Sequence, residues 1–291
     1  MKKYIALILA CILCLGLFAG CGNGTGNESA PPSTEPSSDP SPEASGSAEF
    51  TSTIKVGASP APHAEILEIA KAILAEQGID LQIIEFNDYI IPNTSLEEGD
   101  LDANYFQHIT YLNDFNAEKG THLVSVAEIH YEPFAIYPGQ AASLEELEDG
   151  AQIAVPNDGT NEARALMLLE AQGLIKLKEG VGLSATKLDI AENPHNFDIV
   201  EMEAQLLPAA LADVAVAIIN GNYALGAGLT SEQALAFEDA ASSAAAYVNV
   251  LAIKEGNEEN EDIKALIAAL QSEEVKAFMT ETYGSAVVPA F

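Results

Sequence analysis

Basic residues are scarce in this 291-residue chain. It has 12 lysine and arginine residues against 44 aspartates and glutamates, a formal net charge of −32 at pH 7. Such a surface repels nucleic-acid phosphate, which argues against nucleic acid as a partner. It also repels anionic lipid, so any attachment to a membrane must be covalent or hydrophobic.

Cysteine is scarce too, and all three cysteines lie near the N-terminus, at Cys11, Cys14 and Cys21. The first two fall in an apolar run that resembles an export signal, and removal of the signal would leave at most one. This excludes an intramolecular disulfide framework and a cysteine-ligated zinc site.

Common catalytic motifs are missing as well. The chain has no Gly-x-Ser-x-Gly elbow, no Gly-Lys-Ser/Thr phosphate loop and no His-Glu-x-x-His zinc motif. We therefore expect no enzymatic activity, cofactor or resident metal. Two alternatives stay open, an extracellular hydrolase and a metal-ion receptor in which His108 ligates the ion together with other histidines. The five histidines are His63, His108, His122, His130 and His195.

The N-terminus has the features of an export and anchoring signal. Lys2 and Lys3 precede an apolar run over 5–18, which is shorter than the ~20 residues of a membrane-spanning helix. Small residues then precede Cys21, as in the lipobox of bacterial lipoproteins, although Phe18 stands where leucine is usual. We predict a signal peptide over 1–20 and a diacylated Cys21 that anchors the chain to the extracytoplasmic face of the cell membrane.

Residues 22–49 contain five prolines and no large apolar side chain, which predicts a flexible tether. From residue 50 onward, short apolar strands alternate with amphipathic helices. This rhythm predicts an α/β protein with two lobes, largely parallel sheets and a ligand between the lobes. Strands are predicted at 54–58, 81–86, 122–126, 152–155, 197–202, 214–219 and 247–253, and helices at 63–77, around 111, and at 161–172, 261–270 and 273–283.

Arg164 is the only arginine, and it follows a predicted strand and a polar turn. With Thr160 as N-cap, Arg164 would lie in the first helical turn, beside free backbone N–H groups that favour anions. A guanidinium also matches a carboxylate in shape. We predict that Arg164 binds the carboxylate of a ligand, and that Arg164→Ala weakens binding with little effect on thermal stability. The alternative is an arginine paired with one of the many acidic residues.

Aromatic and amide side chains near predicted strand ends are the other candidates for ligand contacts. Aromatic rings can surround an apolar or thioether group. An asparagine can both donate and accept hydrogen bonds. The aromatic candidates are Tyr89, Phe106, His108 and Tyr111, and the asparagines are Asn220 and Asn249.

At these residues the chain resembles the methionine-binding lipoprotein family (MetQ/NlpA-like), the substrate-binding subunits of methionine ABC importers. The matching segments are 56–67, 86–89, 102–108, 111–112, 155–158, 160–161, 164–166, 173–177, 192–194 and 220–224. The resemblance implies two α/β lobes joined by crossover strands, lobe I over 50–135 and 249–291 and lobe II over 136–248. It implies that Arg164 binds the carboxylate with Asn161 as its neighbour in the ligand site, that Tyr89, Phe106, His108 and Tyr111 form the side-chain pocket, and that Asn220 and Asn249 contact the ligand.

The resemblance also implies a function, the capture of methionine by lobe closure and its delivery to an ABC permease. L-methionine, D-methionine and a methionine-containing dipeptide are all candidate ligands. Side-chain specificity is expected to vary in the segment 129–137.

Overall fold

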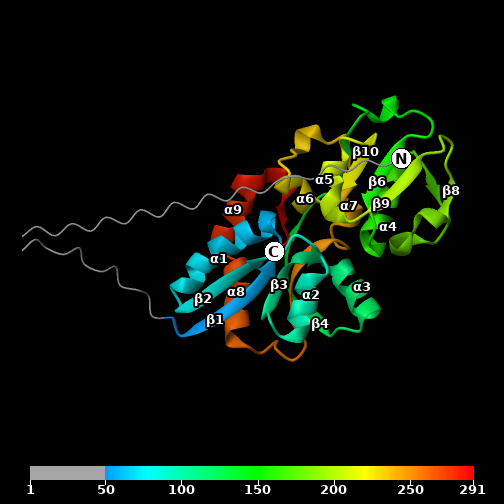
Figure 1. The fold of residues 1–291 in the computed structure, drawn as a ribbon. Helices are drawn as coiled ribbons and strands as arrows, with labels where there is room; N and C mark the ends of the chain where they lie inside the picture. The colour runs from blue at the N-terminus through cyan, green and yellow to red at the C-terminus, as the bar shows by residue number, and fades with distance from the viewer. Residues whose placement is uncertain (1–49) are drawn as a thin grey trace, which may run out of the picture. The chain divides into compact units, whose positions relative to one another are not determined.

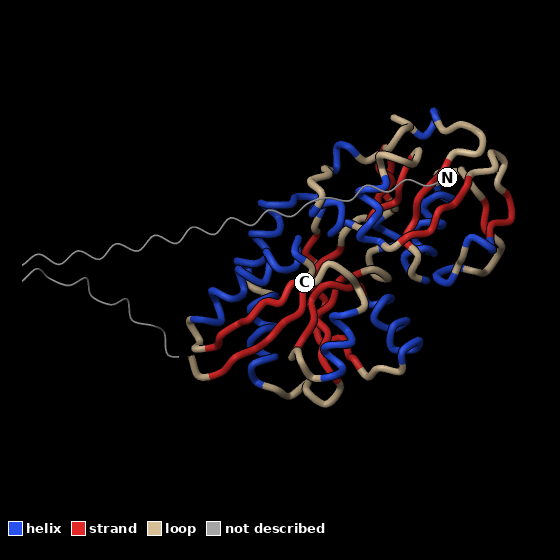
Figure 2. The backbone as a smooth tube through the Cα atoms, viewed as in Figure 1, coloured by secondary structure: helices blue, strands red, loops and turns tan. Residues whose placement is uncertain are grey.

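A computed structural model describes residues 50–291. The predicted signal peptide, Cys21 and the tether lie outside the described residues. Strands and helices alternate along the described part and form two mixed sheets with helices on both faces (Figures 1 and 2). The predicted two-lobed α/β fold is confirmed. The lobe boundaries stay a prediction.

The first sheet has six strands in the order β13-β4-β12-β3-β1-β2. Alternate residues of β12 enter different cores: Leu251 and Ile253 pack with α1, α8 and α9, whereas Val250 and Ala252 pack with α2 and α3. This alternation places the two groups of helices on opposite faces. The strands are β1 (Ser52–Ala58), β2 (Ile79–Glu85), β3 (Ala103–His108), β4 (Leu123–Tyr131), β12 (Val248–Lys254) and β13 (Val288–Pro289); the helices are α1 (Glu65–Ala75), α2 (Ile91–Glu98), α3 (Ile109–Lys119), α8 (Glu261–Leu270) and α9 (Glu273–Tyr283).

The second sheet has five strands in the order β11-β5-β10-β6-β9. Val216 and Ile218 of β10 pack with α4, and Ala217 and Ile219 pack with α5 and α6. The strands are β5 (Ala135–Pro138), β6 (Gln152–Pro156), β9 (Asp198–Met202), β10 (Val216–Ile219) and β11 (Ala236–Phe237); the helices are α4 (Gly159–Ala171), α5 (Leu207–Ala210) and α6 (Gly221–Gly226). A small hairpin of β7 (Lys176–Leu177) and β8 (Ile190–Glu192), and α7 (Ala240–Ser243), complete the described elements.

The expectation of largely parallel sheets was too strong. Within the described residues, β1 pairs with β2 and β3 in parallel, but the three remaining pairs of the first sheet are antiparallel. The second sheet has two parallel and two antiparallel pairs. The antiparallel pairs of the first sheet all involve β4 or β12, and those of the second sheet both involve β5. The predicted ranges also leave out the helices α2, α5, α6 and α7 and the strands β3, β5, β7, β8, β11 and β13.

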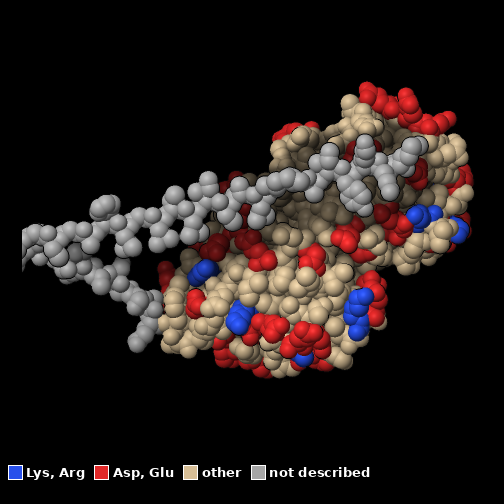
Figure 3. All heavy atoms as spheres, viewed as in Figure 1, with Lys and Arg blue, Asp and Glu red and all other residues tan. Residues whose placement is uncertain are grey.

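Acidic side chains form patches scattered over the molecular face in Figure 3, and basic side chains are few there. Over residues 50–291, none of the helices combines the length and the apolar character that a bilayer crossing requires.

Candidate ligand-binding site

All eight predicted ligand-binding residues line one cavity, and the space left inside it is small, about 20 Å³, room for about one water molecule. The first sheet and its helices contribute Tyr89, Phe106, His108, Tyr111 and Asn249, and the elements of the second sheet contribute Asn161, Arg164 and Asn220. The cavity therefore lies between the two lobes.

The N-terminus of α4 opens onto this cavity, but its cap differs from the prediction. Asp158, and not Thr160, is the N-cap, and its carboxylate accepts the backbone N–H of Asn161 at 3.0 Å. Asp158 also accepts the Asn161 side-chain amide at 2.9 Å. Burial raises the pKa of Asp158, although hydrogen bonds from Asn161 and Thr160 lower it in part. The cap thus fixes the Asn161 side chain at the helix end.

Arg164 lines the cavity and is also paired with an acidic residue of the protein, the alternative that the sequence left open; its binding of a ligand carboxylate stays a prediction. Its side chain is 5 % exposed. Nε donates to Glu238 at 2.9 Å, and Nη2 donates to the other Glu238 oxygen and, at 3.0 Å, to the main-chain oxygen of Glu132. The guanidinium carbon lies 4.1 Å from the ring centroid of Tyr247, a cation–π distance. This packing holds the guanidinium in one orientation.

A chain of amide hydrogen bonds connects elements of the two lobes. His108 caps α3 by accepting the Tyr111 backbone N–H on Nδ1 at 3.0 Å, which leaves Nε2–H to donate to Asn161 Oδ1 at 3.2 Å. Asn220 donates to the same Asn161 oxygen at 2.8 Å. Burial lowers the pKa of His108 to about 3, and the charge of Arg164 lowers it further, so this imidazole is neutral at pH 7.

Three aromatic rings form an apolar wall of the cavity. The Tyr89 ring centroid lies 5.9 Å from that of Phe106 and 5.6 Å from that of Tyr111, within the range of favourable aromatic pairs. The Tyr89 hydroxyl donates to Asn222 Oδ1 at 2.6 Å, which connects the loop after β2 with α6. The rings offer a surface for an apolar or thioether side chain.

Two cavity-lining amide atoms have no hydrogen-bond partner among the described residues. They are the acceptor Asn220 Oδ1 and the donor Asn222 Nδ2, and both side chains are 6 % exposed. Buried polar atoms are rarely left without a partner, because an unmade bond costs about 1–3 kcal/mol. These two atoms therefore indicate a ligand with both donor and acceptor groups.

Sequence analysis missed four cavity-lining residues and the partner of Arg164. Gly221 and Asn222 fall in the 220–224 segment that carries the family resemblance. Glu132 falls in the 129–137 segment, where side-chain specificity is expected to vary. Both segments had therefore been identified from the sequence, although these residues had not. Gln107 was passed over between two predicted contacts. Nothing in the sequence distinguishes Glu238 as the partner of Arg164, because it is one of 44 acidic residues.

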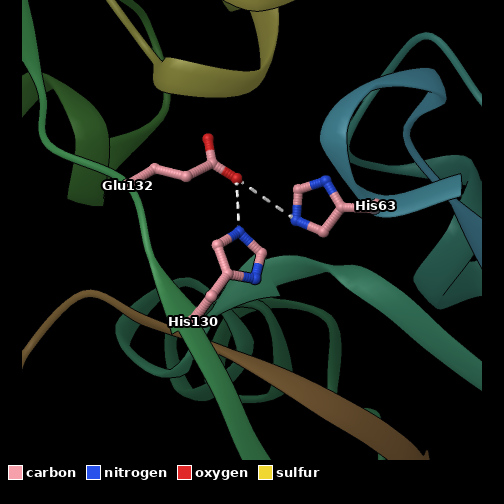
Figure 4. Close-up of side chains that lie close together, drawn as sticks. All are labelled: His63, His130 and Glu132. Carbon is pink, nitrogen blue, oxygen red and sulfur yellow. Dashed lines mark hydrogen bonds and ion pairs between the residues drawn. The ribbon is translucent and has the colours of Figure 1, made fainter. Parts of the chain in front are cut away.

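Glu132 belongs to a buried cluster with two histidines (Figure 4). His130 Nε2 lies 2.7 Å from Glu132 Oε1, and His63 Nε2 lies 3.5 Å from the same oxygen. Burial lowers the pKa of His63 to about 4 and that of His130 to about 3. Burial raises the pKa of Glu132, and the charges of His63 and Arg164 oppose this shift. At pH 7 the imidazoles are neutral, so neither offers full charge compensation.

The expected grouping of His108 with other histidines was wrong. In the part of the chain that the structure describes, His108 bonds Asn161 and Tyr111, and the potential metal-ligating group is His63, His130 and Glu132. The ligating atoms of that group lie within 4.8 Å of one another.

Comparison with known proteins agrees with this fold. The family model of the NlpA lipoproteins matches residues 54–291, which is nearly the whole described part of the chain. The chain belongs to the NlpA lipoprotein family. The resemblance predicted from sequence is thus confirmed.

Several NlpA-family relatives are similar over most of their length. The D-methionine-binding lipoprotein MetQ of Salmonella typhimurium is 44 % identical over 239 residues, 81 % of this chain and 87 % of the relative. A lipoprotein structure from Ruminococcus gnavus is 54 % identical with a TM-score of 0.80, and covers 82 % of this chain and 99 % of its own. A Burkholderia cenocepacia nutrient-binding protein, solved bound to methionine, is 42 % identical with a TM-score of 0.79, covering 82 % and 100 %.

Proposed function

We propose that this chain is a lipid-anchored, extracytoplasmic substrate-binding protein that captures methionine between its lobes and delivers it to an ABC permease. The observation that carries the proposal is the convergence of eight residues, chosen from sequence, on one inter-lobe cavity. Family membership and the methionine named for two relatives support the same ligand. Acylation of Cys21 would supply the anchor.

In this proposal the ligand carboxylate binds the side of Arg164 that Glu238 and Glu132 leave free, near the N-terminus of α4. The thioether side chain lies against Tyr89, Phe106 and Tyr111. Burial of that side chain contributes roughly 1.5–3 kcal/mol. Because the contacts come from both lobes, the ligand stabilises the closed form, and closure presents a distinct surface to the permease.

We also propose that the chain binds its ligand without catalysing a reaction. Among the described residues that line the cavity there is no serine, threonine or cysteine to act as a nucleophile. The relatives named above are described as binding proteins or lipoproteins. An extracellular hydrolase would require turnover of a peptide or ester, and incubation of the protein with methionyl and glycyl-methionine peptides tests that alternative directly.

Calorimetric titration tests the function. The protein is unfolded and refolded to remove bound ligand, and then titrated with L-methionine, D-methionine and glycyl-methionine. We expect one site per chain for at least one of these ligands. Arg164→Lys keeps the charge but loses the planar fork, so we expect about a hundredfold weaker binding. The matched control is Lys264→Arg, which likewise exchanges one basic side chain for the other, on the exposed face of α8. Failure of all three ligands to bind would refute the proposal.

A further inference from the structure

We propose that Glu132 binds the ammonium group of the ligand and that His130 and His63 position its carboxylate, so that the cavity selects free α-amino acids. This inference rests on the proposed function, because it assigns the second charged end of the same ligand. It also separates the candidate ligands: free methionine fits, whereas in glycyl-methionine the ammonium is displaced from the carboxylate by a peptide unit.

The charges that line the cavity support this assignment. Among the described lining residues, Arg164 and Glu132 are the two with formal charge, since His108 is neutral. Arg164 pairs with Glu238, but the ion-pair contacts of the Glu132 carboxylate are with His63 and His130. A buried carboxylate without a cation is costly. A ligand ammonium would supply the missing cation.

The positions of the two charged residues match an α-amino acid, in which the ammonium and the carboxylate are attached to one carbon. Arg164 Nη2 donates to the main-chain oxygen of Glu132 at 3.0 Å, so the guanidinium and Glu132 are neighbours. Between residues 50 and 291, however, their side chains form no ion pair with each other, because the guanidinium is held by Glu238. The cation and the anion are therefore close together, and both residues line the cavity.

The two histidines hold one side of the Glu132 carboxylate. Figure 4 shows both rings directed at Oε1, while the second oxygen points away from them. The Tyr105 hydroxyl bonds Nδ1 of His130, which leaves Nε2–H of His130 to donate to Glu132. His63 Nε2 also lies 3.1 Å from Asn249 Oδ1.

The other side of the carboxylate faces α6. A Cβ atom on Gly221 would lie 2.6 Å from Glu132 Oε2, so only glycine leaves room for the carboxylate here. The nearby backbone N–H of Asn222 lowers the pKa of Glu132. The carboxylate is thus fixed from both sides at the cavity wall.

The same three side chains could in principle hold a zinc ion, as His₂Glu sites do. The hydrogen bonds argue against this use. The imidazole nitrogen of His130 that would face the ion already points its proton at Glu132, and that of His63 lies within hydrogen-bond distance of Asn249. We therefore assign the cluster to positioning Glu132, and include zinc as an outcome of the test.

The experiment compares two ligands that differ only in the amino group, L-methionine and 4-(methylsulfanyl)butanoate, by calorimetry on refolded protein. We expect the native chain to bind the des-amino analogue about a hundredfold more weakly, because a buried charge loses its partner. We expect glycyl-methionine to bind more weakly than methionine as well. Equal affinity for methionine and the des-amino analogue would overturn this inference and leave the proposed function standing. No methionine binding at all would overturn the function itself.

Variants test the roles proposed for Glu132 and His130. In Glu132→Gln we expect methionine affinity to fall about a hundredfold and that of the des-amino analogue to change less than about threefold. His130→Asn should show the same ligand-specific loss, whereas a merely structural defect would weaken both ligands equally. The matched control is His122→Asn, an exposed histidine just before β4. If Glu132→Gln does not fold, the comparison of methionine with its des-amino analogue on the native chain still tests the inference.

A zinc titration completes the test. Stoichiometric Zn²⁺ binding that His63→Asn abolishes, together with loss of methionine binding in EDTA, would show that the cluster is a metal site and overturn the inference. Methionine binding that EDTA leaves unchanged supports it.

Discussion

At the scale of single residues, the buried pair of Arg164 and Glu238 links stability to the proposed binding role. Glu238 accepts from Nε and Nη2 of Arg164, from the Tyr131 hydroxyl at 2.5 Å and from the Phe134 N–H at 3.0 Å. An arginine without a protein partner could be removed at little cost, as sequence analysis assumed. The Glu238 pair reverses that expectation.

We therefore predict that Arg164→Ala lowers the free energy of unfolding by about 3–5 kcal/mol, because it leaves Glu238 buried without its cation. Denaturant unfolding of the ligand-free protein measures this change. The control is the double variant Arg164→Ala with Glu238→Ala, in which the orphaned charge is gone. A single variant as stable as the native chain would show that Glu238 does not depend on Arg164.

Glu132 predicts how methionine binding depends on pH. Burial raises its pKa above the ordinary value of 4.5, and His63, Arg164 and the Asn222 N–H oppose the shift. The ammonium binds the ionised carboxylate, so protonation competes with the ligand. Affinity should be full at high pH and should fall as the pH drops through the Glu132 pKa, starting above pH 4.5.

Calorimetry between pH 7.5 and 4.5 measures this dependence. His63 and His130, with pKa values of about 4 and 3, stay neutral over most of this range and do not mask the effect. Glu132→Gln should flatten the profile of its residual binding. A native profile that is flat down to pH 4.5 would contradict the assignment of the ammonium to Glu132.

At the scale of elements, the first turn of α6 packs against Glu132. The two glycines of α6 allow the effect of this packing to be distinguished from the effect of helix propensity. A Cβ on Gly221 would lie 2.8 Å from the Glu132 Cβ, whereas one on Gly226 meets nothing within 4 Å. We predict that Gly221→Ala destabilises the protein by about 1–3 kcal/mol and weakens methionine binding. Gly226→Ala should keep the affinity and raise stability by up to about 1 kcal/mol.

Thermal unfolding and calorimetry of the two alanine variants check this prediction. Native-like affinity in Gly221→Ala would mean that Glu132 can move without loss, which conflicts with a fixed ammonium site.

Elements with regular apolar patterns were predictable from sequence, and α8 and α9 were predicted with the bounds that the structure has. The strand β3 was not, because its six residues are all buried although Asn104 and Gln107 are polar. Asn93 of α2 bonds both: it exchanges two hydrogen bonds of 2.7 Å with Gln107 and accepts from Asn104 at 3.2 Å. A buried polar pair whose partner is distant in sequence cannot be recognised from local pattern.

The site was predictable to a similar degree. Residues at strand ends were identified because chain topology brings strand ends together. The Glu238 partner and the histidine cluster depend on contacts between segments far apart in sequence, such as His63 with Asn249, and no spacing rule reveals them.

At the scale of the whole molecule, three buried neutral histidines make the fold sensitive to acid. The pKa values of His63, His108 and His130 are lowered to about 4, 3 and 3, mainly by burial. In the unfolded chain they take up protons near pH 6.5. Their contribution to stability is therefore full above pH 6.5 and is lost as the pH falls below it.

We predict that the free energy of unfolding decreases as the pH falls from 6 to 5, by at most about 4 kcal/mol per pH unit, since the unfolded chain binds up to three more protons at these histidines and the raised pKa values of Glu132 and Asp158 offset part of that uptake. Urea unfolding at each pH measures the slope. His130→Asn should reduce the slope by about a third, and His195→Asn, an exposed histidine, should leave it unchanged. Equal slopes in all three proteins would contradict the burial of a neutral His130.

The central claim is that the inter-lobe cavity receives a free amino acid between Arg164 and Glu132, and a crystal structure of the refolded protein grown with L-methionine tests it most directly. The account predicts the carboxylate on Arg164, the ammonium on Glu132 and the thioether among Tyr89, Phe106 and Tyr111. Methionine bound elsewhere, or bound in the cavity without touching Arg164, would contradict it.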